Sequence, residues 1–276
     1  MPTGDLSRIR TNIGALTALD ALNQVNTKLS IHNLRLATGK RINSAGDDPA
    51  GLTLGNSLDV RARKLAQALN NIGDASNVLS VAESGLNNIN DILSTMSEKI
   101  IQAASDTEGP YERAAIFQEL NNLGEELDAI TKQTQFNGVA LLTSTVLTFQ
   151  VGPDGVDYNV FNMSSSFTSA ALGISSLTVA SQALASASLG SVSAAIVSVK
   201  TALQQLGALL ERFSIKADNE AAARLNQQAA ASRILDADLA AEQLESSKLQ
   251  ILRQTSTAQL AAANTAAASI LTLFQR

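Results

Sequence analysis

The chain has 276 residues, a formal net charge of −5 and no cysteine, and its hydrophobic content of 45% includes only 3% aromatic residues and no tryptophan. The acidic balance lacks the clustered lysine and arginine that phosphate backbones require, so nucleic acid is not an expected partner. Without cysteine, disulfides, thiolate metal sites and a cysteine nucleophile are excluded. A hydrophobic set rich in Ala, Leu, Ile and Val is typical of seams between long helices.

The N-terminus shows no apolar segment after a basic start, so we expect no secretory signal peptide and, for an exported chain, another route. Residues 158–199 hold no charged residue, but Ser and Thr interrupt them every few positions. They therefore lack the ~20 consecutive apolar residues that a membrane span needs. We expect no membrane span.

The first predicted helix runs from Leu6 to Leu36, where apolar residues recur three or four apart with one phase slip between Leu16 and Leu22. Its stripe consists of Leu6, Ile9, Ile13, Leu16, Leu22, Val25, Leu29 and Leu36. Gly39 suits a left-handed C-cap, and Asp48 followed by Pro49 supplies an N-cap acid and the proline tolerated at a first helical position. Residues 39–48 are thus predicted to link two helices.

The second predicted helix, roughly 49–106, has a strict seven-residue repeat. The repeat consists of Leu58, Leu65, Ile72, Leu79, Leu86, Leu93 and Ile100, with Ala68, Ala75, Ala82, Ile89 and Met96 three positions later. Such a repeat keeps one seam facing a partner helix, as in a left-handed coiled coil.

A third helix is expected after Pro110, ending near an Asn-Gly turn at 137–138. Two alternating apolar runs then flank the turn residues 152–155, which predicts a β-hairpin at about 143–162. The Ser-rich residues 162–188 are interpreted as an irregular surface crossing.

Two further helical stripes follow. The first consists of Leu189, Val192, Ile196, Val199, Leu203, Leu206, Leu210 and Phe213, and the last of Leu249, Leu252, Leu260, Ala263, Ala267, Ile270 and Phe274. A helix stripe is stable in water only when it is buried. The three central stripes can bundle together, whereas pairing the two terminal ones would leave apolar surface for other copies to cover.

The predicted fold is therefore mainly α: a long coiled-coil helix bundle formed by the N- and C-terminal halves, with a small β-hairpin region. Residues 1–43 and 237–276 would form a terminal coiled-coil domain, and residues 44–236 a helical rod domain. No separate outer domain is expected.

No catalytic, metal or cofactor site is expected, and the chain is predicted not to be an enzyme. His32 is the only histidine, so neither a His-based triad with a second relay nor a His-rich metal site can be built. We interpret His32 as a partly buried structural residue and Asp47 and Asp48 as capping acids. No phosphate-binding glycine motif follows a strand.

Three sequence blocks carry more information than the periodicity. They are TGKRINSAGDDPAGL at 38–52, QTQFNGVALL at 133–142 and SRILDAD at 232–238, supported by RTNIGAL at 10–16 and LAAAN at 260–264. Together they closely resemble bacterial flagellin, over roughly residues 1–160 and 190–276. The first block contains the helix-link motif Arg41, Asn43, Asp47, Asp48 and Pro49.

The resemblance implies a structural subunit that polymerises into the flagellar filament used for swimming. In flagellins the two chain ends form a helical pair lining the inner tube, and they fold on assembly. The subunit is exported unfolded through the flagellum's own channel, so the expected location is extracellular. Expected partners are further copies of the chain, an export chaperone, and cap and hook-associated proteins.

One departure from the family concerns an innate-receptor epitope. Flagellins sensed by the vertebrate Toll-like receptor carry Leu-x-Arg-x-Arg-Glu-Leu on the long helix, and this chain has Leu93, Thr95, Ser97 and Lys99 at the corresponding leucine, arginine, arginine and leucine positions. Both arginines and the second leucine are replaced. The resemblance therefore predicts weak or absent receptor activation.

The alternative within the family is a hook–filament junction protein, which shares such end motifs; the complete blocks at 133–142 and 232–238 favour the filament subunit. A coiled-coil signalling module and a membrane translocator share the heptads. The first needs a transmembrane helix and the second a long apolar hairpin, and neither is evident in the sequence.

Overall fold

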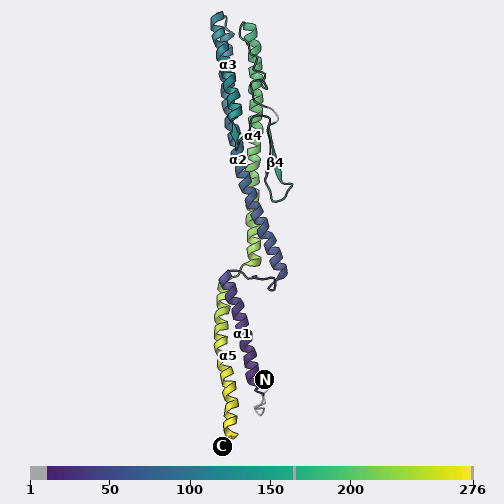
Figure 1. Ribbon diagram of the computed structural model, residues 1–276, viewed down its shortest axis with the longest axis vertical. Helices are drawn as coiled ribbons and strands as arrows, with labels where there is room; N and C mark the ends of the chain where they lie inside the picture. The colour runs from purple at the N-terminus through teal and green to yellow at the C-terminus, as the bar shows by residue number, and fades with distance from the viewer. Residues whose placement is uncertain (1–10, 164–165, 275–276) are drawn as a thin grey trace. The chain divides into compact units, whose positions relative to one another are not determined.

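The computed structural model describes residues 11–163 and 166–274, with side chains described through Ala266 in the last helix. Five helices dominate the described residues (Figure 1): α1 (Ile13–Thr38), α2 (Pro49–Ala103), α3 (Pro110–Gln133), α4 (Gln182–Leu235) and α5 (Leu239–Phe274). The strands are β1 (Gln135–Phe136), β2 (Val139–Ala140), β3 (Val146–Gln150) and β4 (Tyr158–Asn162). The predicted fold class, mainly α with a small hairpin region, is confirmed.

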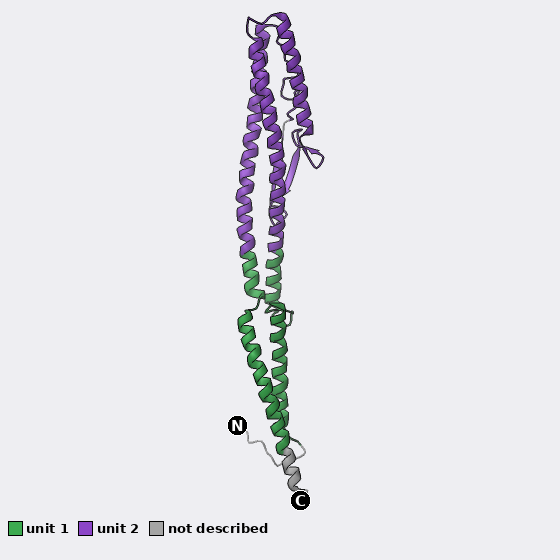
Figure 2. Cartoon of the chain, turned by 90° about the vertical axis from the view of Figure 1, so that its left-hand side faces the viewer, with its two compact units in different colours: residues 1–60, 226–276 green, residues 61–225 purple. Residues whose placement is uncertain are grey.

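The chain forms two compact units, coloured separately in Figure 2. Unit 1 comprises residues 1–60 and 226–276, and unit 2 comprises residues 61–225. Unit 1 thus contains α1, α5 and the adjoining ends of α2 and α4. Unit 2 contains α3, the strands and the larger parts of α2 and α4.

The heptad repeat of α2 forms the centre of unit 2. From Leu65 to Ile100 every position of the repeat is at most 3% exposed, and so is every partner position from Ala68 to Met96. Side chains at this spacing lie on one face of a helix, so one seam along α2 stays buried. The predicted coiled-coil stripe is confirmed.

Helices α3 and α4 complete that core and run alongside α2 within unit 2 (Figures 1 and 2). Their fully buried side chains include Leu127 of α3 and Phe213 of α4. Phe213 meets Phe149 of β3 edge-on, with ring centroids 6.0 Å apart and planes at 89°. This arrangement is favoured by the aromatic quadrupoles.

The predicted hairpin is present as β3 and β4, paired antiparallel with Leu147 opposite Phe161. Alternation turns Phe161 toward the core while Val146 and Val160 remain exposed. A second, shorter hairpin of β1 and β2 was not predicted. Its turn residues Asn137 and Gly138 have φ of 49° and 80°, the left-handed values that an Asn-Gly turn accommodates.

The interpretation of residues 162–188 as a surface crossing is wrong in two respects. Helix α4 already begins at Gln182. Before it, the segment buries apolar side chains in the core of unit 2, namely Met163, Phe167, Ile174, Leu177 and Val179. The backbone N–H and hydroxyl of Ser169 also donate to the Asp128 carboxylate at 2.6 and 2.9 Å, which fixes the crossing to α3.

Of the helices in the described ranges, α4 is long and apolar enough to cross a membrane by length and composition alone. This is weak evidence, because the core helix of a soluble protein meets the same criterion. Val192, Val199, Leu206 and Phe213 of α4 lie buried in the core of unit 2. The absence of a membrane span stays a prediction.

Candidate functional site

The link between α1 and α2 is built as its sequence predicts at both ends. Gly39 ends α1 with φ of 69°, and its N–H donates to the Arg35 carbonyl oxygen at 2.8 Å. Asp48 precedes Pro49, the first residue of α2, and its carboxylate accepts from the Gly51 N–H at 2.9 Å. This is the standard N-cap geometry, which satisfies a backbone donor at the helix start.

Inside the link, Asp47 closes the loop rather than capping a helix. One carboxylate oxygen accepts the N–H groups of Asn43 and Ser44 at 3.0 and 2.9 Å. These two backbone bonds, that of Ser44 being the stronger influence, lower the pKa of the Asp47 carboxyl from its ordinary value of 3.8. The Asn43 side chain in turn donates to the Lys40 carbonyl oxygen at 2.8 Å.

The same link is bound to the junction between α4 and α5. The Arg41 N–H donates to the Leu235 carbonyl oxygen at 2.7 Å, and the Ala237 N–H donates to the Gly39 carbonyl oxygen at 2.9 Å. Ile42, only 4% exposed, anchors the link on its apolar side. The α1–α2 link and the α4–α5 junction, far apart in sequence, are therefore joined by hydrogen bonds. The five residues of the helix-link motif lie in this link or next to it.

Helices α1 and α5 pack against each other through a narrow seam. Its best-buried apolar members are Leu29 at 6% exposure and Leu249 at 2%, while Leu22 and Leu260 are half-buried. The α1 side consists of Ala15, Ala18, Leu22, Val25, Leu29, His32 and Leu36. These residues are spaced three or four apart without interruption. The predicted stripe omitted the two alanines because it followed their more hydrophobic neighbours.

Polar contacts also cross the seam. His32 Nδ1 contacts the Glu242 carboxylate, which Arg35 also approaches at 3.5 Å. The Ser246 hydroxyl, 1% exposed as a residue, donates to the Asn33 side chain at 3.0 Å. His32 is thus a partly buried structural residue, as its sequence predicts. Such polar layers specify register at the cost of stability.

Several predicted stripe residues do not lie in this seam. Ile13 and Leu16 are 47% and 56% exposed on the other side of α1. The phase slip before Leu22 therefore marks a change from the outward face of the helix to the face in the seam. Leu252 is likewise exposed at 40%. Further exposed aliphatic residues of the pair are Leu19, Ile31 and Leu34 on α1 and Leu239, Leu244 and Ile251 on α5.

Five predicted stripe residues cannot be placed in this way. Leu6 and Ile9 lie outside the described residues. Ala267, Ile270 and Phe274 belong to α5, but their side chains are outside the described set. The stripe residues that can be placed show that α1 and α5 both expose aliphatic side chains outside the seam between them.

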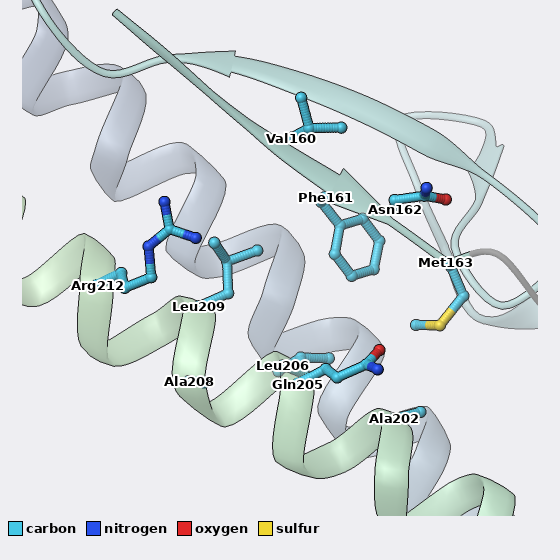
Figure 3. Close-up of a pocket in the computed structure, with 10 residues that line it drawn as sticks. All are labelled: Val160, Phe161, Asn162, Met163, Ala202, Gln205, Leu206, Ala208, Leu209 and Arg212. Atoms are coloured by element: carbon cyan, nitrogen blue, oxygen red, sulfur yellow. The ribbon is translucent and has the colours of Figure 1, made fainter.

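A separate groove in unit 2 lies between β4 and α4 and has a volume of about 210 Å³ (Figure 3). Phe161 points from the strand toward α4, whereas Val160 points away from it. Arg212 of α4 donates to the side chain of Asn159 at 3.0 Å. This groove joins hairpin to helix and contains no cluster of acid, base and nucleophile.

The four innate-receptor positions on α2 differ in accessibility. Leu93 is fully buried in the core of unit 2, and Ser97 is half-buried. Thr95 is exposed and bonds its own helix through the Asp91 carbonyl oxygen at 3.1 Å. Lys99 forms an ion pair of 2.8 Å with Glu119 of α3. In the ranges that the structure describes, no group of three His, Cys, Asp or Glu side chains could hold a metal ion.

Comparison with known proteins agrees with the helical architecture. Residues 9–146 match the bacterial flagellin N-terminal helical region, and residues 189–274 match the bacterial flagellin C-terminal helical region. The chain is 32% identical to the flagellar filament 30.7 kDa core protein of Treponema maltophilum, covering 96% of this chain and 99% of that protein. It is 33% identical to a flagellin of Halalkalibacterium halodurans, covering 87% and 90% respectively.

A solved structure of a flagellar hook-associated protein from Vibrio parahaemolyticus superposes with a TM-score of 0.57. It covers 69% of this chain and 100% of that protein at 17% identity, so it shows a shared fold and does not choose between functions. Both terminal helical regions, by contrast, match flagellin itself, and the filament relatives match along nearly their whole length. The chain belongs to the bacterial flagellin family, a family of structural proteins whose members are subunits of the flagellar filament.

Proposed function

We propose that this filament subunit polymerises through the exposed faces of α1 and α5, and that it has no catalytic role. The observation that carries the proposal is the aliphatic surface of unit 1, which includes Ile13 and Leu16 on α1 and Leu244 and Ile251 on α5. Exposed aliphatic side chains gathered on one pair of helices are unfavourable in water and favour an interaction face. Further copies of the same chain would cover it.

The proposed division of the chain follows the link. Residues 1–43 and 237–276 form the terminal coiled-coil domain and residues 44–236 the helical rod domain. The ends of α1 at Thr38 and of α4 at Leu235 support these boundaries, which fall within unit 1 rather than between the two compact units. We further propose an extracellular location, reached by export with a flagellar chaperone, and assembly with cap and hook-associated proteins.

Seeded polymerisation of the purified, full-length protein tests the function. Electron microscopy should show long filaments, whereas a hook–filament junction protein should stop at a limited ring. Deleting residues 1–40 or 240–276 should abolish polymerisation while circular dichroism still reports the central helices. Filaments grown from either truncated chain would contradict the proposal.

We also propose weak or absent activation of the flagellin-sensing receptor, because Thr95 and Ser97 provide no guanidinium donors and Lys99 is held by Glu119. A receptor reporter assay with pure monomer tests this. Potent signalling would show that the altered positions do not control recognition.

A further inference from the structure

The part of the α1–α5 pair formed by the first half of α1 and the C-terminal part of α5 contains almost no charged residues. From Ile13 to Thr27 the only charged residue is Asp20, and from Leu249 to Phe274 the only one is Arg253. Both side chains are exposed, and neither pairs with an opposite charge among the described residues. A single acid and a single base of this kind stand out on a surface that otherwise presents aliphatic and small polar groups.

Asp20 lies on the outward side of α1. Ala18 and Leu22, two residues before and after it, are half-buried in the seam, and a step of two residues turns a helix by about 200°. The exposed Ile13 and Leu16 share this outward face with Asp20. The carboxylate therefore sits within an apolar stripe, where it only accepts a hydrogen bond from the Gln24 side chain at 2.9 Å.

Arg253 occupies a different setting. It stands four residues after Leu249 and three before Ser256, so its backbone holds a seam position of α5. Its side chain lines an open groove of about 550 Å³ between the two helices, together with Leu22, Asn26, Thr257, Ala258 and Ala261. The small residues of α5 leave room for another helix to approach closely.

We infer that this groove receives the outward face of α1 from a second copy of the chain, and that Asp20 of that copy pairs with Arg253. The inference rests on the proposed polymerisation. Burying the apolar stripe in the groove desolvates the guanidinium, and a buried charge is tolerated only when it is paired.

The other acids of α1 and α5 are already engaged. Helix α1 contains no acid besides Asp20, and α5 contains only Glu242 and Glu245. Glu242 contacts His32 and Arg35 across the seam, and Glu245 pairs with Lys248 at 3.2 Å. Asp20 is thus the acid of these helices that remains available to a neighbouring Arg253, and the pairing sets the register between copies.

Mixed polymerisation of charge-reversed chains tests the contact. Asp20→Arg alone and Arg253→Asp alone should each raise the critical concentration for seeded growth by ~10-fold or more. A 1:1 mixture should recover growth, because each chain supplies the charge that the other lacks. A pairing within one chain could not be rescued by mixing. As a matched control, Lys28→Asp reverses an exposed charge on the same helix but keeps both Asp20 and Arg253, so it should polymerise like the unaltered protein.

Cross-linking supplies a measurement that does not depend on these reversals. The natural chain has no cysteine, so Thr17→Cys in one preparation and Thr257→Cys in another introduce single thiols beside the two charges. In mixed filaments a short bis-maleimide should join the two variants, and in monomer it should not.

Three results would overturn the inference while leaving the proposed function intact: single reversals that polymerise like the unaltered protein, a mixture that stays inactive, or a loss of growth in Lys28→Asp as large as that in Asp20→Arg. Failure of the unaltered protein to polymerise would overturn the proposed function as well.

Discussion

Arg41 Nη2 donates a hydrogen bond of 2.8 Å to the carbonyl oxygen of Ile234, although 193 residues separate the two in sequence. Ile234 lies in the last turn of α4, where carbonyl groups have no partner within the helix and the helix dipole is negative. A cation is therefore favourable there, and the helix-link motif stabilises a helix end as well as a loop.

Replacing Arg41 by alanine should lower the free energy of unfolding by about 1 kcal/mol, because one charge-assisted bond at an exposed helix end is lost. Urea denaturation of the full-length protein measures the change. Arg41→Lys keeps the charge but not the planar guanidinium, so it should recover part of the loss. Equal stability of all three proteins would rule out this capping role.

Gly55 is a close-contact position in α2. A Cβ there would come within 2.5 Å of Leu235 Cγ, so Gly55→Ala should overpack the contact and destabilise the chain by about 1–3 kcal/mol. Gly73, in the same helix, has no neighbour within 4 Å of an added Cβ. Gly73→Ala should therefore stabilise by about 0.5–1 kcal/mol through helix propensity. Changes of the same sign in thermal unfolding would contradict the packing argument.

Leu93 is a core residue, whatever its position in a receptor motif. Its truncation to alanine should cost about 2–5 kcal/mol, since a fully buried leucine leaves a cavity. Thr95→Ala, two positions away on the exposed side, should change stability by no more than about 0.5 kcal/mol. Chemical denaturation followed by circular dichroism compares the two. A mild effect of Leu93→Ala would show that unit 2 can collapse around the gap.

Ile13→Glu separates assembly from folding. Ile13 is 47% exposed, so the substitution should alter the unfolding free energy of the monomer by no more than about 0.5 kcal/mol. In a filament the same side chain would become a buried, unpaired carboxylate, and seeded growth should stop. Ile13→Met preserves an apolar surface and should polymerise. Filaments of Ile13→Glu with normal growth would remove this face from the interface.

Acid should weaken the link through Asp47. The pKa of Asp47 is lower in the folded state than in the unfolded chain, so ionised Asp47 stabilises the fold above its ordinary pKa of 3.8. That contribution is lost as the pH falls through the folded-state pKa. Between roughly pH 5 and pH 2 the unfolding midpoint should fall less steeply in Asp47→Asn than in the natural protein. Parallel curves would count against this role.

The sequence predicts most of unit 2 because its strongest signals are periodic. The heptads of α2 repeat without error from Leu58 to Ile100, and a repeat of seven has one physical solution, a buried seam. The ends of the link were equally predictable, since Gly39 and Pro49 restrict the backbone themselves. Residues 162–181 were misread because an irregular segment can bury Phe167 or Ile174 without any period.

The seam between α1 and α5 shows a different limit. Ile13 and Leu16 are more hydrophobic than Ala15 and Ala18, so a hydrophobic stripe follows the former, yet the alanines face α5. Small side chains allow two helices to approach closely. In the sequence, only the three-four spacing shows that these alanines belong to the seam. The sequence also could not show that Arg253 lines a groove, because that depends on which side of α5 meets Leu22.

The pairing of α1 with α5 also means that only a full-length chain can form this helix pair. Asn12, at the start of α1, donates to the Ala263 carbonyl oxygen at 2.9 Å across a separation of 251 residues. During synthesis α1 must therefore wait, without its partner, until nearly the whole polypeptide has been made. Contacts of such long range form late and slowly. A truncated chain lacks α5 and cannot form the α1–α5 seam. It therefore cannot present the paired-helix surface that other copies would bind.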